Sequence, residues 1–207
     1  MRSIFGFIEF ASIILTEPKT LIVAAHRISL KESYTTVCSL LAALSLATSI
    51  FYVRSHYSFS YLIFIPVATA VIFLFQRLFS RLLSAKIVQN LVEAPLTQSS
   101  KGIADVAQIS SALDALFESA FLPGLFVLPI CITAKQFSHP SFLILPGLIA
   151  LSLWMLYIQF AAVQYILEAD RRTTITALAR NHTMIILFPL LAFYVASILL
   201  MIIVNVR

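Results

Sequence analysis

Charged residues are scarce in this sequence, and their scarcity excludes most soluble proteins. Asp, Glu, Lys and Arg make up 11% of the 207 residues, 60% are hydrophobic, and the mean hydropathy is +0.98. Soluble globular domains carry roughly 25% charged residues. The hydrophobic residues stand in long uninterrupted runs, whereas outer-membrane barrels show alternating segments of about ten residues. The sequence therefore predicts an all-α integral membrane protein.

Glycine, cysteine and histidine are also few, and each shortage removes a class of site. The chain has four glycines and contains neither a Walker-type phosphate loop nor a Gly-x-Gly-x-x-Gly motif. Its two cysteines, Cys38 and Cys131, fall within apolar runs and indicate packing residues, so neither a disulfide framework nor a metal site is expected. It also lacks His-Glu-x-x-His and Gly-x-Ser-x-Gly. We expect no catalytic residues, no cofactor, no metal and no enzyme activity.

Five apolar runs are long enough to cross a bilayer, which takes roughly 20 residues per helix. The predicted spans cover residues 35–53, 57–79, 113–134, 141–167 and 183–206. Residues 80–112 form a cytoplasmic elbow between the second and third spans. The predicted fold is thus a five-helix transmembrane domain at residues 35–207.

Residues 1–34 precede this domain and differ from it. The apolar run 3–15 is too short to span a bilayer and is interrupted by Glu9. A signal peptide is the alternative, but no small-x-small cleavage site follows the run. We therefore predict cytoplasmic interfacial amphipathic helices for residues 1–34, with a turn at Glu17 and Pro18.

Basic residues alternate between the two sides of the predicted membrane. From the N-terminal region through the successive loops to the C-terminus, the counts are 4, 1, 4, 1, 3 and 1, which places 11 on one side and 3 on the other. By the positive-inside rule the N-terminus is cytoplasmic and the C-terminus outside, in the cytoplasmic (inner) membrane if the protein is bacterial. The net charge of +5 thus follows topology. We expect anionic lipid headgroups as its partner, and no nucleic acid.

Two acidic residues stand at the start of the third span. The uncharged stretch Ser119–Ala134 has 16 residues, which is about 24 Å of helix. A bilayer's hydrocarbon core is about 30 Å thick. A span here therefore draws Glu118 into or beside the apolar layer, with Asp114 one turn behind on the same face. Buried carboxylates usually face a protein interior, a watery cleft or a partner, so this is a candidate polar cluster.

Arg77 and Arg81 follow the second span on the same predicted side of the membrane. One interpretation is that they extend towards anionic lipid headgroups. The other makes one of them the counter-ion of Glu118 or Asp114. The sequence leaves both interpretations open.

Two prolines interrupt the third span. Pro123 and Pro129 each remove one backbone donor, which frees the carbonyls of Ser119 and Leu125. We predict a bent central helix with a polar cytoplasmic mouth.

Three features together resemble the Ypt-interacting-protein (Yip) membrane domain family, including its prokaryotic branch. One is the N-terminal apolar segment followed by Leu15-Thr16-Glu17-Pro18-Lys19, a Leu-Thr-acidic-Pro turn. Another is the five-span count with a cytoplasmic N-terminus. The last is the run Phe117–Leu122 ending in Pro123, together with the connection from Glu168 to His182, EADRRTTITALARNH. The resemblance implies a role beside other proteins: eukaryotic relatives act in vesicle trafficking with small GTPases, and prokaryotic ones accompany transporters.

The absence of catalytic motifs and the resemblance lead to one expected function. The chain is expected to be a non-enzymatic scaffold or accessory subunit that binds other membrane protein subunits. The alternative is a transport component for lipid or an apolar solute, with the proline-broken third helix lining the path.

Overall fold

The computed structural model describes residues 2–20, 32–53, 61–93, 103–183 and 185, and every regular element in these ranges is a helix. In chain order these are α1 (Arg2–Thr16), α3 (Glu32–Val53), α4 (Tyr61–Val88), the π-helix η1 (Gln89–Glu93), α6 (Ile103–Ser119), the 3₁₀-helix η2 (Leu122–Phe126), α7 (Val127–Ala134) and α8 (Ser141–Ile166). A further helical segment, residues 171–183, follows α8. The all-α prediction is confirmed.

Four helical stretches in the described ranges are long and apolar enough to cross a membrane. They are Tyr34–Val53, Leu62–Leu91, Val106–Ala134 and Ser141–Ile166. They overlap the first four predicted spans, extending beyond the second and starting before the third, and they are compatible with an integral membrane location. The predicted fifth span, 183–206, lies outside the described residues except for positions 183 and 185, as do residues 21–31 of the predicted N-terminal region.

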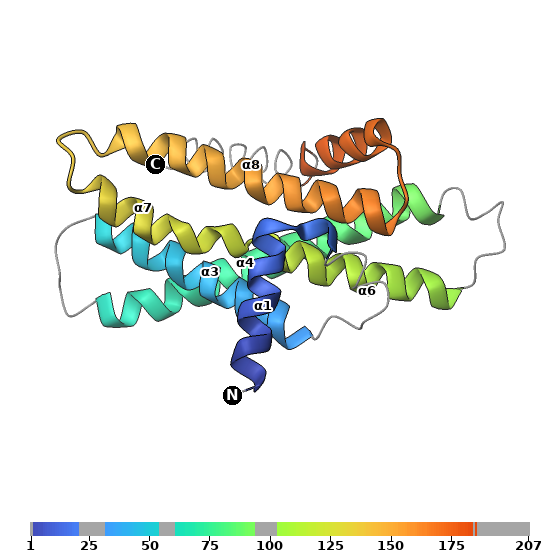
Figure 1. Cartoon of the computed structure of the whole chain (residues 1–207), viewed down its shortest axis with the longest axis horizontal. Helices are drawn as coiled ribbons and strands as arrows, with labels where there is room; N and C mark the ends of the chain where they lie inside the picture. The colour runs from blue at the N-terminus through green and yellow to red at the C-terminus, as the bar shows by residue number, and fades with distance from the viewer. Residues whose placement is uncertain (1, 21–31, 54–60, 94–102, 184, 186–207) are drawn as a thin grey trace, which may run out of the picture.

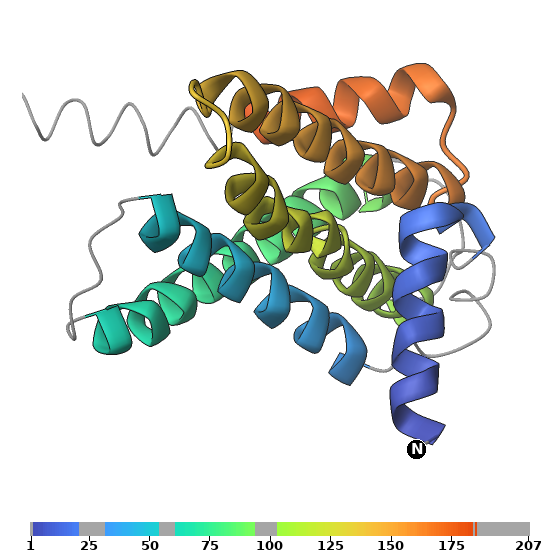
Figure 2. The same ribbon diagram turned by 60° about the vertical axis from the view of Figure 1, so that its left-hand side comes forward.

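The long helices run side by side along one axis (Figures 1 and 2). α3 packs on α4, α6, η2 and α7, while α8 packs on α6 and α7. The end of α3, the start of α4, the end of α7 and the start of α8 lie at one end of the bundle, and η1 and the start of α6 lie at the other (Figure 1). α4 is helical well past residue 79 and continues into η1, so the first part of the predicted elbow extends the second span.

Small side chains form the buried face of α3. Its buried residues include Cys38, Ser39, Ala42, Ala43, Ser45, Ala47 and Ser49. Small residues allow helix backbones to approach closely. The approach is close at Gly124 of η2, where an added Cβ would stand 3.2 Å from the Ala42 Cβ. α3 is therefore the helix against which the broken central segment packs.

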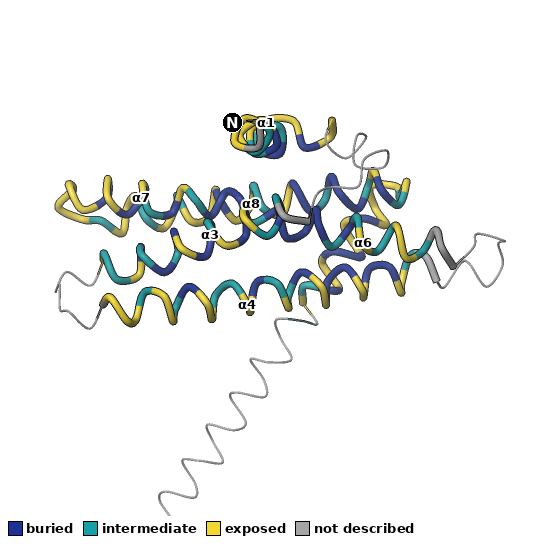
Figure 3. The backbone as a smooth tube through the Cα atoms, turned by 90° about the horizontal axis from the view of Figure 1, so that it is seen from below, coloured by how far each residue is buried: buried dark blue, intermediate teal, exposed yellow. Residues whose placement is uncertain are grey.

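α1 lies crosswise to the long helices and is seen end-on beside them in Figure 3. Phe10 and Ile14 are buried in the main core, and the rings of Phe7 and Phe10 pack against Tyr34 at centroid distances of 6.1 and 5.5 Å. One stripe of α1 is thus fixed to the bundle. Another leaves large apolar side chains exposed, namely Ile4, Phe5 and Ile8.

A turn at Glu17 and Pro18 follows α1. The amide of Glu17 donates to the Ile13 carbonyl, Pro18 is buried, and a new helical turn covers residues 18–20. The ammonium group of Lys19 lies 5.8 Å from the centroid of the Tyr165 ring near the end of α8. The turn therefore lies near the end of α8.

Candidate functional site

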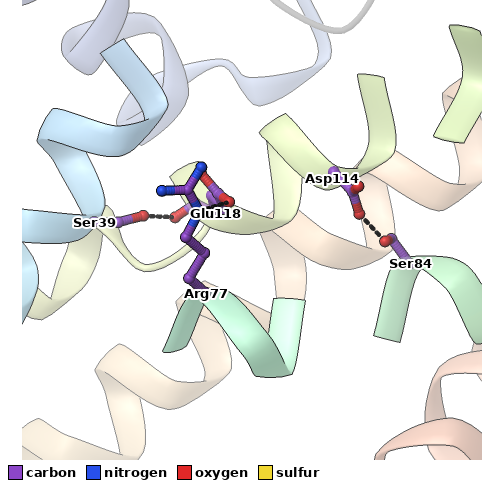
Figure 4. Close-up of polar contacts among 5 residues, drawn as sticks. All are labelled: Ser39, Arg77, Ser84, Asp114 and Glu118. Atoms are coloured by element: carbon purple, nitrogen blue, oxygen red, sulfur yellow. Dashed lines mark hydrogen bonds and ion pairs between the residues drawn. The ribbon is translucent and has the colours of Figure 1, made fainter. Parts of the chain in front are cut away.

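An ion pair joins α4 to α6. The Nε of Arg77 lies 3.4 Å from Oε1 of Glu118 (Figure 4). Glu118 is 6% exposed, whereas the Arg77 side chain is 38% exposed. A buried charge is costly unless it is paired. The structure thus makes Arg77 a counter-ion of Glu118, which was one of the two interpretations that the sequence left open.

Asp114 lies one turn before Glu118 and faces the same helix. The hydroxyl of Ser84 donates a hydrogen bond to Oδ1 of Asp114 (Figure 4). Arg81 is exposed and acts on Asp114 through electrostatic attraction. Three residues of the predicted cluster, Arg77, Asp114 and Glu118, therefore meet at the α4–α6 interface, while Arg81 stands at its surface.

The central helix is interrupted beside this interface. α6 ends at Ser119, residues 122–126 form the 3₁₀-helix η2, and α7 begins at Val127. Pro123 stands at the start of η2, where a missing amide hydrogen removes no helical bond. Pro129 is in the first turn of α7, a position that proline tolerates for the same reason. The two prolines thus mark the two helix starts.

Two serines of α3 bond the backbone of this break. The hydroxyl of Ser39 donates to the Glu118 carbonyl at 2.9 Å (Figure 4). The hydroxyl of Ser45 donates to the Leu125 carbonyl at 3.1 Å and accepts from the Leu128 amide at 3.3 Å. Leu125 carries one of the carbonyls that the sequence predicts to be freed. α3 therefore supplies hydrogen bonds to backbone groups before and after the break.

Two further buried polar residues lie on α4, and the sequence did not single them out for burial. Gln76 is 3% exposed and Ser80 is 1% exposed. In the described part of the chain, neither amide atom of Gln76 nor the hydroxyl of Ser80 has a hydrogen-bond partner. Their spacing with Ser84, four residues each time, is the signal that could have placed all three on one stripe.

The helical segment 171–183 packs beside the end of α4. Asn90 of η1 donates to the Asn181 side chain at 3.2 Å, and the ring centroids of Phe79 and His182 lie 5.7 Å apart. Burial lowers the pKa of His182, although its contact with the Leu178 carbonyl acts in the opposite direction. Neither Asn90 nor His182 was predicted to form a contact, because residues so far apart in sequence show no shared pattern.

Asp170 begins this segment. Its carboxylate accepts from the amides of Arg172 at 3.1 Å and Thr173 at 3.5 Å, as a helix N-cap does. The hydrogen bond from the Thr173 side chain, and then those from the backbone, hold the pKa of Asp170 below its ordinary value. α8 itself ends with Glu168 in the left-handed conformation, at φ 49°. The connection from Glu168 to Asp170 is thus a defined helix stop and start.

Within the described ranges, no group of three or more His, Cys, Asp or Glu side chains is placed to hold a metal ion. Comparisons of the chain with protein-family models, curated proteins and solved structures found no match. The resemblance to the Yip family therefore rests on the sequence features alone.

Proposed function

We propose that this chain is a multi-pass membrane protein that acts, without enzymatic activity, as a scaffold or accessory subunit of a larger membrane complex. The observation that carries the proposal is the way α3 closes the central break. Gly124 packs against Ala42, and Ser45 bonds both Leu125 and Leu128. A broken helix whose backbone is bonded and covered by its neighbour is a packing element. This favours a structural role over a path along the break.

The outer faces of the bundle supply the surface that such a role requires. α4 and α8 expose large apolar side chains over much of their length, among them Ile63, Phe75, Phe142, Leu145 and Leu153. In a bilayer such side chains contact lipid or other transmembrane helices. We propose that other membrane protein subunits bind here, in agreement with what the Yip resemblance implies.

α1 supports a cytoplasmic N-terminus held at the membrane surface. A helix turns 100° per residue, so Ile4 and Glu9 point about 140° apart, and both are exposed. The stripe through Phe10 and Ile14 is fixed to the bundle. α1 therefore has a core stripe, an apolar exposed stripe and a polar exposed stripe. A helix that lies in the inner interface, crosswise to the spans, needs these three surfaces.

A transport component for lipid or an apolar solute is the second candidate. The observation in its favour is the polar interface of α4 and α6, where an ion pair lies next to a broken helix. Ionisable groups near interrupted helices mark the substrate sites of many transporters.

Two measurements separate these candidates. The full chain, tagged at its N-terminus, is extracted from native membranes in mild detergent, and the proteins in stoichiometric amount with it are identified. A scaffold is expected to carry a defined membrane partner, and Leu145→Trp and Leu153→Trp on the exposed face of α8 should release that partner. Ile175→Trp, exposed on the segment 171–183, is the control that should retain it.

The same purified chain is then reconstituted in liposomes with fluorescent lipid. Lipid movement by the chain alone, with no stoichiometric partner in native membranes, would overturn the scaffold proposal in favour of transport. A stoichiometric partner in native membranes, with no lipid movement by the purified chain, would support the scaffold proposal.

A further inference from the structure

One stripe of α4 carries three buried polar residues in succession. Gln76, Ser80 and Ser84 are spaced four apart, so they follow one another along one side of the helix. Ser84 bonds Asp114, but the side-chain atoms of Gln76 and Ser80 have no hydrogen-bond partner in the described part of the chain. Both residues are at least nine-tenths buried. The unsatisfied polar atoms of α4 are thus concentrated within about two turns.

The position of Ser80 directs its hydroxyl towards α6. Arg77 and Ser84, on either side of it, both contact α6, at Glu118 and Asp114. At 100° per residue, Ser80 points about 60° from Arg77 and about 40° from Ser84. Its hydroxyl therefore lies on the α6 side of α4, between the levels of the two carboxylates. Figure 4 shows the residues of these two contacts.

Buried hydroxyl and amide groups without partners are rare in native proteins, since each leaves its desolvation cost uncompensated. Such groups commonly bind an internal water molecule, which needs two to four polar partners. Ser80 and Gln76 offer donors and acceptors, and the carboxylates of Asp114 and Glu118 accept hydrogen bonds. A cation fits less well, because the positively charged guanidinium of Arg77 lies at the same α4–α6 interface, 3.4 Å from Glu118.

We propose that the α4–α6 interface contains a water-binding site, with ordered water bonded to Ser80 and Gln76 and reaching the carboxylates of Asp114 and Glu118. The site goes beyond the scaffold function, which does not require a hydrated interior. Its position beside the helix break gives the bundle a wet polar site at the inner end of otherwise apolar spans.

The sign of a stability change tests the proposal. If the Ser80 hydroxyl is dry and unpartnered, Ser80→Ala removes a burial cost and raises the melting temperature of the purified chain. If it binds water, Ser80→Ala lowers the melting temperature, and Gln76→Leu does the same. Ser84→Ala, which loses a direct bond to Asp114, is the control that should lower it in both cases. A rise for both Ser80→Ala and Gln76→Leu would overturn the proposal.

Cysteine accessibility provides a second readout that does not depend on stability. In a chain with Cys38→Ala and Cys131→Ala, the variant Ser80→Cys should react with a small water-soluble thiol reagent. A cysteine at Leu83, which is fully buried on the same helix, should not. Equal protection of the two positions, together with a higher melting temperature for Ser80→Ala, would contradict the proposal. If the melting temperature differs between sodium and choline salts at equal ionic strength, the site binds a cation in place of water, and the proposal is overturned.

Discussion

The hydroxyl of Ser45 donates to the Leu125 carbonyl at 3.1 Å and accepts from the Leu128 amide at 3.3 Å. One side chain of α3 therefore bonds two backbone groups on opposite sides of the junction between η2 and α7. In an apolar surrounding each such group costs several kcal/mol when it has no partner. The break in the central helix is thus stable because a serine from a neighbouring helix lies beside it.

Ser45→Ala is expected to destabilise the bundle, since it removes hydrogen bonds from both Leu125 and Leu128. The expected loss is about 2 kcal/mol, the usual range for a buried group left without its partner. Thermal unfolding in detergent, followed by circular dichroism, measures it. Ser152→Ala is the matched control, because the exposed Ser152 hydroxyl bonds the Leu148 carbonyl of its own helix. Equal stability of the two variants would contradict the role of Ser45.

The Arg77–Glu118 pair should respond asymmetrically to substitution. Arg77→Met leaves the buried Glu118 carboxylate without this counter-ion, whereas Glu118→Gln leaves a guanidinium that is 38% exposed to the surroundings. We expect Arg77→Met to cost about 2 kcal/mol, between the values for exposed and buried pairs, and Glu118→Gln to cost less.

A double-mutant cycle measures the coupling of this pair, and the double variant should be more stable than the sum of the single losses predicts. Arg81→Met, on the exposed neighbour, should change the free energy of unfolding by less than about 0.5 kcal/mol. If Arg81→Met lowered the free energy of unfolding as much as Arg77→Met, any positive charge at this surface would be stabilising, and the pairing with Glu118 would not explain the loss.

Gly124→Ala tests the close approach of η2 to α3. The added Cβ would meet the Ala42 Cβ at 3.2 Å, and that atom is fixed to the α3 backbone. Overpacking of this kind costs about 1–3 kcal/mol. In an Ala42→Gly background the same substitution should cost much less, because the opposing methyl group is gone. A cost that is unchanged in that background would place the strain elsewhere.

His182 should make stability depend on pH. Burial lowers its folded-state pKa below the ordinary value of 6.5, so the unfolded chain binds the proton more readily. The stabilisation is complete above the unfolded pKa and is lost as the pH falls from 6.5 towards the lower folded value. Melting temperatures across this window should fall with acidification in the wild type and much less in His182→Phe, which retains a ring beside Phe79. His139→Gln, at an exposed position, should behave as the wild type does.

α1 should lie in the inner membrane interface with its apolar stripe towards the acyl chains. Spin labels at Ile4→Cys and Glu9→Cys, in the full chain reconstituted in liposomes, test this by collision with oxygen and with a water-soluble nickel complex. Oxygen should reach the label at position 4, and nickel the label at position 9. If the nickel complex reached both labels, α1 would not be inserted into the membrane interface. If position 4 were protected from both reagents, a protein partner would cover the apolar stripe of α1.

Much of the helical architecture follows from the sequence alone. Long apolar runs and their polar ends are local properties of the chain, and they predicted four long helical stretches that the structure has in the same order along the chain, although α4 and α6 extend beyond the predicted spans. The clustering of Asp114 and Glu118 on one face, and the interruption at Pro123, depend on spacing within one segment and could likewise be predicted. The five-helix count and the membrane orientation stay predictions.

The partners of those residues depend on how helices rotate and pack against one another. The sequence could not choose between Arg77 and Arg81, which are one turn apart on the same helix, because the choice depends on which stripe of α4 faces α6. It also gave no sign that Ser39 and Ser45, about 80 positions earlier in the chain, would bond the backbone of the break. Hydrophobic run length and helical period determine which segments form helices, and only tertiary packing determines which polar groups those helices bring together.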